Sequence, residues 1–132
     1  MRLLVLRLAA APVAAMLAGC AAPSPPPDTP HARLAASWAV FQAFPEAGIE
    51  SQCAARLRAF ATTAQQVKDI QRSGRPLDPV SGDVLESDTR QAASACEGDV
   101  RRLCAAAVTP ESLAACGAYR RLPPQRRQFT SG

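Results

Sequence analysis

The sequence has little of what enzymes and metalloproteins use for chemistry. Its 132 residues include one histidine, His31, and its five cysteines form neither a C-x-x-C pair nor a haem-attachment motif. It also lacks a glycine-rich phosphate loop, a G-x-S-x-G nucleophile motif and an H-E-x-x-H zinc motif. We therefore expect no enzyme, no metal or other cofactor, and no small-molecule substrate.

Large apolar side chains are also scarce. Hydrophobic residues make up 48% of the chain, but alanine dominates them and only 5% of the residues are aromatic. An alanine side chain buries little area at roughly 25 cal/mol per Å², so the core is thin. Small exported domains with thin cores are commonly reinforced by disulfides, and four cysteines remain when Cys20 is set aside.

Residues 1–19 have the three-part pattern of a secretory signal peptide. Two arginines precede an apolar run over residues 8–17, and two small residues follow before Cys20. Only about 11 apolar residues follow the last charge, whereas a membrane-spanning helix needs about 20. The pattern therefore predicts export and not a membrane span.

The four residues from Leu17 to Cys20, Leu-Ala-Gly-Cys, resemble the lipobox of bacterial lipoproteins. The resemblance implies that Cys20 is diacylated, that the signal is removed before it, and that the new amino group is acylated. Two or more acyl chains give stable membrane anchoring where one would be marginal. Ala21 and Ala22 carry no aspartate signal for inner-membrane retention, so we expect an anchor in the outer membrane that faces the periplasm.

Prolines dominate the stretch after the anchor, AAPSPPPDTP. Proline restricts its own backbone and that of the preceding residue, so residues 20–31 are predicted to form a semi-rigid tether rising about 3.1 Å per residue. We expect the tether to hold a helical domain, residues 32–122, roughly 30 Å from the bilayer. A basic flexible tail, residues 123–132, completes the predicted domain organisation.

Helical spacing of apolar residues predicts a small all-α bundle of about four helices. The first covers residues 32–44, with Trp38 in a core stripe between Leu34 and Phe41. A partner-binding aromatic is the alternative interpretation of Trp38. The second covers residues 50–72 and is followed by a loop over residues 75–86, which contains two prolines and a Ser-Gly pair.

Two further helices are predicted after this loop. Asp88 and Gln91 have the spacing of a capping box, which predicts a third helix over residues 88–107. Thr109 followed by a proline and a glutamate predicts the start of a short fourth helix, which ends near Leu122.

The four remaining cysteines are predicted to form two disulfides in the oxidising periplasm. Cys96 and Cys104 lie about 12 Å apart on one predicted helix, too far for a mutual bond. An antiparallel register around the predicted loop places Cys53 closer to Cys104 than to Cys96. This register favours Cys53–Cys104 with Cys96–Cys116 over the other set, Cys53–Cys96 with Cys104–Cys116.

The C-terminal segment concentrates positive charge on a chain whose formal net charge is +4. Its arginines and its one aromatic anchor are Arg120, Arg121, Arg126, Arg127 and Phe129. The segment is either a solvated end beside a helix C-terminus or a docking segment for an acidic partner or an anionic lipid surface. A lipid-tethered exported protein is not expected to bind nucleic acid.

Taken together, these features predict a periplasm-facing lipoprotein that binds another envelope protein as an adaptor or assembly factor. The organisation is similar to that of the helical secretion pilotins, lipoproteins that escort secretin subunits to the outer membrane. No residue motif carries this similarity, so it transfers no functional residues. Two alternatives stay open: an inhibitor, immunity or entry-exclusion lipoprotein, and a passive structural lipoprotein of the envelope.

Overall fold

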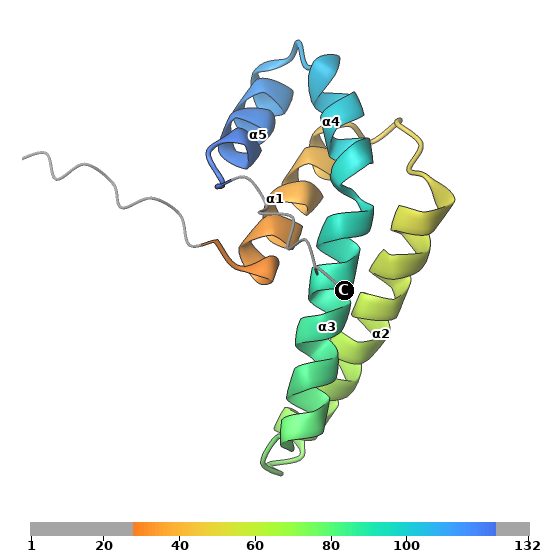
Figure 1. Cartoon of the computed structure of the whole chain (residues 1–132), viewed down its shortest axis with the longest axis vertical. Coiled ribbons are helices and arrows are strands. Elements are labelled where there is room, and N and C mark those ends of the chain that lie inside the picture. Colours follow the sequence, from red (N-terminus) through yellow and green to blue (C-terminus); the bar gives the residue numbers. More distant parts are fainter. Residues whose placement is uncertain (1–27, 124–132) are drawn as a thin grey trace, which may run out of the picture.

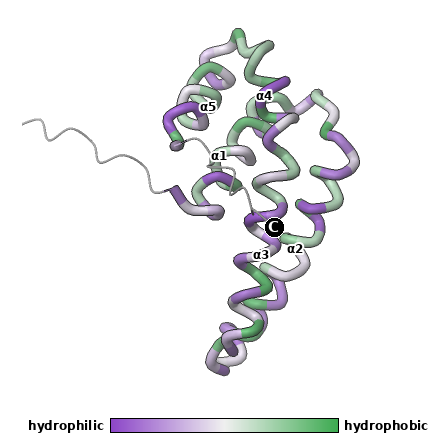
Figure 2. The backbone as a smooth tube through the Cα atoms, viewed as in Figure 1, coloured by the Kyte–Doolittle hydropathy of each residue, from purple (hydrophilic) through white to green (hydrophobic). Residues whose placement is uncertain are grey.

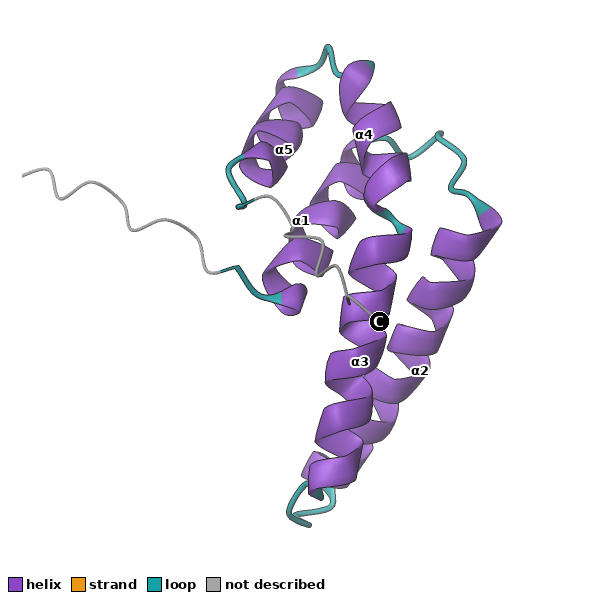
Figure 3. Ribbon diagram, in the orientation of Figure 1, coloured by secondary structure: helices purple, strands orange, loops and turns teal. Residues whose placement is uncertain are grey.

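A computed structural model describes residues 28–123, which contain five α-helices joined by short connections and no strand (Figure 3). The helices are α1 (Pro30–Ala43), α2 (Ser51–Arg72), α3 (Pro79–Ala95), α4 (Glu97–Ala105) and α5 (Pro110–Arg120). One disulfide joins α2 to the junction of α3 and α4, and a second joins α4 to α5. The predicted fold class, a small all-α bundle held by two disulfides, is confirmed.

The helices are arranged around α3 (Figure 1). α2 and α3 form a hairpin, α4 follows α3 after a bend at Cys96, and α5 turns back beside α4. α1 packs on α3, α4 and α5, whereas its direct backbone contact with α2 is slight. The closed end of the α2–α3 hairpin projects beyond the other helices, so the core lies at the opposite end (Figure 1).

Three helices begin with the same capping arrangement. Thr29, Asp78 and Thr109 are N-caps whose side-chain oxygens accept a backbone N–H from three residues further along the chain, at 2.9 to 3.1 Å. A proline follows each cap at the first helical position, where its missing N–H is not needed. The predicted start at Thr109 is confirmed. α1 begins before residue 32, so His31 belongs to its first turn and not to the tether.

The predicted loop over residues 75–86 is wrong, because α3 already begins at Pro79. The Asp78 carboxylate accepts hydrogen bonds from both the backbone N–H and the hydroxyl of Ser81, at 2.9 and 2.6 Å. These bonds lower the pKa of Asp78 from its usual value of 3.8. Gly82 lies in the first turn, where a glycine costs about 1 kcal/mol relative to alanine and does not break the helix.

The prediction of one helix over residues 88–107 is also wrong. The helix begins earlier, at Pro79, and the region contains two helices, α3 and α4. Asp88 lies inside α3 and caps nothing; its carboxylate accepts a hydrogen bond from the Thr63 hydroxyl at 2.6 Å, which joins α3 to α2. The helical path is interrupted at Cys96, which ends α3 and caps α4.

The preferred disulfide pairing, Cys53–Cys104 with Cys96–Cys116, is also wrong. The bonds are Cys53–Cys96, with a Cα–Cα distance of 4.7 Å, and Cys104–Cys116, with 5.6 Å. The error follows from the loop: with α3 starting at Pro79, the antiparallel register places Cys53 opposite about residue 98, and not 106. Cys96 and Cys104 are not bonded to each other, as expected for their spacing on one helical path.

The core surrounds both disulfides. Cys53, Cys96 and Cys116 have no exposed surface, and the apolar side chains around the four cysteines are Val40, Phe41, Val100 and Leu103. A smaller cluster of Leu34, Ala92 and Ala93 joins α1 to α3, with Leu57 and Phe60 of α2 packed against it.

No helix among residues 28–123 is long and apolar enough to cross a membrane. Figure 2 shows why: hydrophilic and hydrophobic residues are interspersed along each described helix.

Candidate binding surface

Trp38 is the principal departure from the predicted core. Its side chain is 51% exposed, whereas its stripe neighbours Leu34 and Phe41 are buried, so the prediction that Trp38 is a core residue is wrong. The buried positions of α1 are Arg33, Leu34, Ser37, Val40 and Phe41. At about 100° per residue, Trp38 lies about 100° from the centre of that face, at its edge and not within it.

A groove of about 470 Å³ lies between α1 and α2, on one side of Trp38. Both helices pack on α3 but hardly on each other, which leaves this space open. Its α1 wall consists of His31, Leu34, Ala35 and Trp38, and its α2 wall of Leu57, Arg58, Phe60 and Ala61. The walls are therefore apolar apart from His31 and Arg58.

A second depression of about 250 Å³ lies on the other side of Trp38. It extends from the C-terminal half of α1 over the connection to α2, and it is lined by Phe41, Gln42, Phe44, Pro45, Ala47, Ile49 and Leu103. Because Trp38 lines both spaces, they form one apolar strip along α1 with the indole in the middle. We call this strip the Trp38 groove.

The far end of the Trp38 groove is fixed by a buried acid. Asp99 is 1% exposed, and its carboxylate accepts the Glu50 N–H at 3.0 Å and an Arg102 N–H at 2.6 Å. Arg102 also donates to the Gly48 carbonyl at 2.8 Å. These bonds attach the connection between α1 and α2 to α4, so the wall formed by Ala47 and Ile49 is held in place.

Arg33 lies on the buried face of α1 and is only 7% exposed. Its guanidinium pairs with the Asp28 carboxylate at 2.9 Å and donates a hydrogen bond to the Pro123 carbonyl. One side chain of α1 thus holds the start and the end of the described chain together. Nothing in the sequence pattern indicates this contact, since arginine is mostly found exposed.

Charge is distributed unevenly around the Trp38 groove. Arg58 is exposed in the larger of the two spaces, which His31 also lines and which forms the near end of the Trp38 groove, and none of the ion pairs formed within residues 28–123 involves it. At the far end, Glu46 is exposed between the lining residues Pro45 and Ala47. The groove is therefore basic at one end and acidic at the other.

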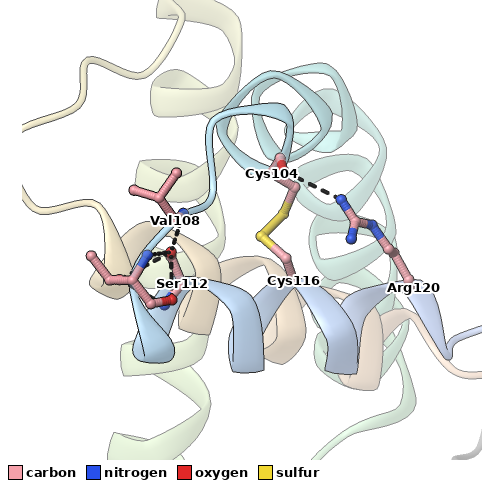
Figure 4. The surroundings of a disulfide bond; sticks show 6 residues. Cys104, Val108, Ser112, Cys116 and Arg120 are labelled. Atoms are coloured by element: carbon pink, nitrogen blue, oxygen red, sulfur yellow. Dashed lines mark hydrogen bonds between the residues drawn. A yellow bond between two sulfur atoms is a disulfide. The ribbon is translucent and has the colours of Figure 1, made fainter.

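The C-terminal arginines predicted as docking residues are only partly within the described chain. Arg120 donates to the Cys104 carbonyl at 3.3 Å beside the Cys104–Cys116 disulfide (Figure 4), and Arg121 is exposed at the end of α5. Arg126, Arg127 and Phe129 lie outside the described residues, as does the predicted lipidation site Cys20.

The same corner of the molecule contains the capping box of α5. Ser112 is buried, and its hydroxyl accepts the N–H groups of Val108 and Thr109 at 3.2 and 3.0 Å (Figure 4). Tyr119, three residues after Cys116 on α5, is half-buried. Burial and the negative charge of Glu97 raise the pKa of its hydroxyl above 10.0.

Within residues 28–123, no three histidine, cysteine, aspartate or glutamate side chains come together as a metal site would require. Every buried side-chain nitrogen and oxygen of this region has a hydrogen-bond partner. Comparison of the chain with family models, curated proteins and solved structures finds no match. The Trp38 groove is consequently the feature of the described structure that calls for a functional explanation.

Proposed function

We propose that this chain is a small lipoprotein, anchored through acylated Cys20 in the outer membrane, whose helical domain binds another envelope protein as an adaptor or assembly factor. The Trp38 groove carries the proposal. Contiguous apolar surface on a soluble domain commonly marks a binding site, and tryptophan is enriched among the residues that dominate binding energy. A passive structural role would give no reason to leave Trp38 half exposed.

The two disulfides support the proposed compartment. Disulfides form and persist in the periplasm and are rare in the cytosol, where thiols are kept reduced. The position of α1 supports the proposed orientation, because its first turn forms the near end of the Trp38 groove and is eleven residues from Cys20. An anchor at Cys20 followed by the predicted tether would hold the groove roughly 30 Å from the bilayer, on the periplasmic side.

The proposal is tested by affinity purification of the tagged full chain from membranes of the bacterium that encodes it, after chemical crosslinking. Wild type is compared with Cys20→Ser, which removes the attachment point of the lipid. We expect wild type to be recovered from outer membranes with an envelope protein, and Cys20→Ser to be released into the periplasm.

The identity of the recovered protein decides between the adaptor and its closest alternative. A component of a secretion or conjugation complex supports the adaptor, whereas a toxin or hydrolase would make the chain an inhibitor or immunity lipoprotein. Recovery of wild type alone, from either membrane, would contradict the proposed function.

A further inference from the structure

We infer that the Trp38 groove binds an amphipathic α-helix of the partner protein, with carboxylates at the end that lies over Arg58 and His31. This inference rests on the proposed function and specifies its partner. The length, the shape and the charge of the groove support it.

The length of the groove fits a helix of about four turns. The lining residues of α1 and its C-cap extend from His31 to Phe44, which corresponds to about 20 Å at 1.5 Å per residue. A partner helix of about 14 residues covers the same distance. Apolar residues at positions i, i+4, i+7 and i+11 of that helix would contact the two depressions and the exposed Trp38 indole between them.

The shape also favours a helix over a narrower ligand. α1 and α2 both rest on α3 without packing closely on each other, so they form two walls. The lining residues Leu34, Leu57 and Phe60 pack on Ala92 and Ala93 of α3 beneath them. A partner helix placed there would pack its side chains between those of α1 and α2, as the helices of a bundle pack on one another. A single acyl chain in so open a groove would leave much of its surface in water, and an added strand would find no sheet edge in the described chain.

The charges give the partner helix a direction. Arg58 is exposed without an acidic neighbour in ion-pair distance among the described residues, and His31 adds a second basic group at the same end. Glu46 is exposed at the other end. An Asp or Glu at the near end of the partner helix and a Lys or Arg at its far end are therefore complementary to the groove.

Site-specific photo-crosslinking tests the inference in the full, lipidated chain in its own membranes. Trp38→p-benzoyl-phenylalanine and Phe60→p-benzoyl-phenylalanine place the probe on the two walls. Leu113→p-benzoyl-phenylalanine is the matched control, because Leu113 on α5 is 52% exposed, nearly the same as Trp38, but lines neither depression. We expect positions 38 and 60 to crosslink to one segment of one protein, and position 113 to give no such product.

Sequencing the crosslinked peptide gives the decisive result. Apolar residues at helical spacing with Asp or Glu at one end support the inference. A crosslink to lipid, to a second copy of this chain, or to a segment without helical periodicity overturns it. If whole-chain crosslinking recovers a partner that positions 38 and 60 never contact, the adaptor function stands and the groove inference falls. If no partner is recovered by any route, both fall.

Two substitutions measure the apolar and the charged contributions separately. Trp38→Ala is expected to lower recovery of the partner about 30-fold or more, as hot-spot truncations do, with Leu113→Ala close to wild type. Arg58→Glu is expected to lower recovery about 10-fold, whereas Arg56→Glu, an exposed residue of α2 outside the groove, makes the same charge change with little effect. Equal losses for Arg56→Glu and Arg58→Glu would overturn the predicted orientation.

Discussion

The two disulfides should differ measurably in what they contribute to stability. Cys53–Cys96 closes a loop with a sequence separation of 43 residues, and Cys104–Cys116 one of 12. Because a crosslink removes more entropy from the unfolded chain when its loop is longer, their contributions to the free energy of unfolding are about 4 and about 3 kcal/mol. For a domain of this size, a difference of about 1 kcal/mol shifts the melting temperature by about 4–8 °C.

The assay compares the double variants Cys53→Ala with Cys96→Ala, and Cys104→Ala with Cys116→Ala. Both are made in the Cys20→Ser chain to avoid lipid, and both are followed by circular dichroism during heating. The alanine substitutions remove similarly buried sulfurs, since Cys104 alone has any exposed surface, 7%. We expect both variants to melt below the parent, and the first below the second. The reverse order would refute the loop-length reasoning.

Tryptic digestion without reduction tests the pairing itself. Cleavage after arginine leaves Cys104 and Cys116 in one peptide, residues 103–120, and places Cys53 in residues 34–56 and Cys96 in residues 91–101. The observed bonds therefore give one internally closed peptide and one linked pair. Cys53–Cys104 with Cys96–Cys116 would instead join all three peptides into a single product.

Three further predictions concern the contacts that hold the bundle together. Thr109→Ala removes the N-cap of α5 and should lower the free energy of unfolding by about 1 kcal/mol in urea denaturation, with the exposed Thr62→Ala as a nearly silent control. Arg33→Met keeps the buried stem but removes its bonds to Asp28 and Pro123, and should cost about 1.5–3 kcal/mol in the same assay. Tyr119, the only tyrosine, should ionise above pH 10.0 in the folded protein by ultraviolet difference absorbance, and near 10 when denatured. Because its folded pKa is the higher one, its contribution to stability is present below pH 10 and is lost as the pH rises above that value; ionisation at the same pH in both states would contradict this.

The sequence predicts the helices well where apolar spacing and capping residues agree. Helical spacing predicts a helix over residues 50–72, and α2 spans Ser51–Arg72. Thr109 with the following proline marks the start of α5. The same cap-and-proline signal is present at Asp78, but the neighbouring Ser81-Gly82 pair indicated a loop. The two hydrogen bonds from Ser81 to the Asp78 carboxylate stabilise the helical start over a loop. The spacing of residue types does not reveal these bonds.

One misplaced helix start then determined the disulfide error. Pairing was inferred from the register of an antiparallel hairpin, and register depends directly on the length of the connecting loop. Trp38 shows a different limit. Helical spacing identifies an apolar stripe, but it does not reveal that α2 stays apart from α1 and leaves the edge of that stripe open. The exposure of Trp38 is determined by how α1, α2 and α3 pack together, which the sequence of α1 alone does not show.

Substitutions that fill the Trp38 groove separate effects on binding from effects on folding more clearly than Trp38→Ala does. Ala35 and Ala61 are exposed on opposite walls, and their small side chains leave the space above Leu34 and Phe60 open. Ala35→Leu and Ala61→Leu should therefore occupy that space while changing the free energy of unfolding by no more than about 0.5 kcal/mol, as is usual for surface substitutions.

The same two variants should abolish partner recovery in the membrane crosslinking assay, because a helix backbone cannot approach a groove that leucine side chains already occupy. Ala39→Leu is the matched control: Ala39 is exposed on α1 but lines neither depression, so partner recovery should be unchanged. If all three variants retain the partner and their wild-type stability, the exposed indole of Trp38 is not part of a docking surface, and the apolar strip reflects only the incomplete cover that a small, disulfide-held core tolerates.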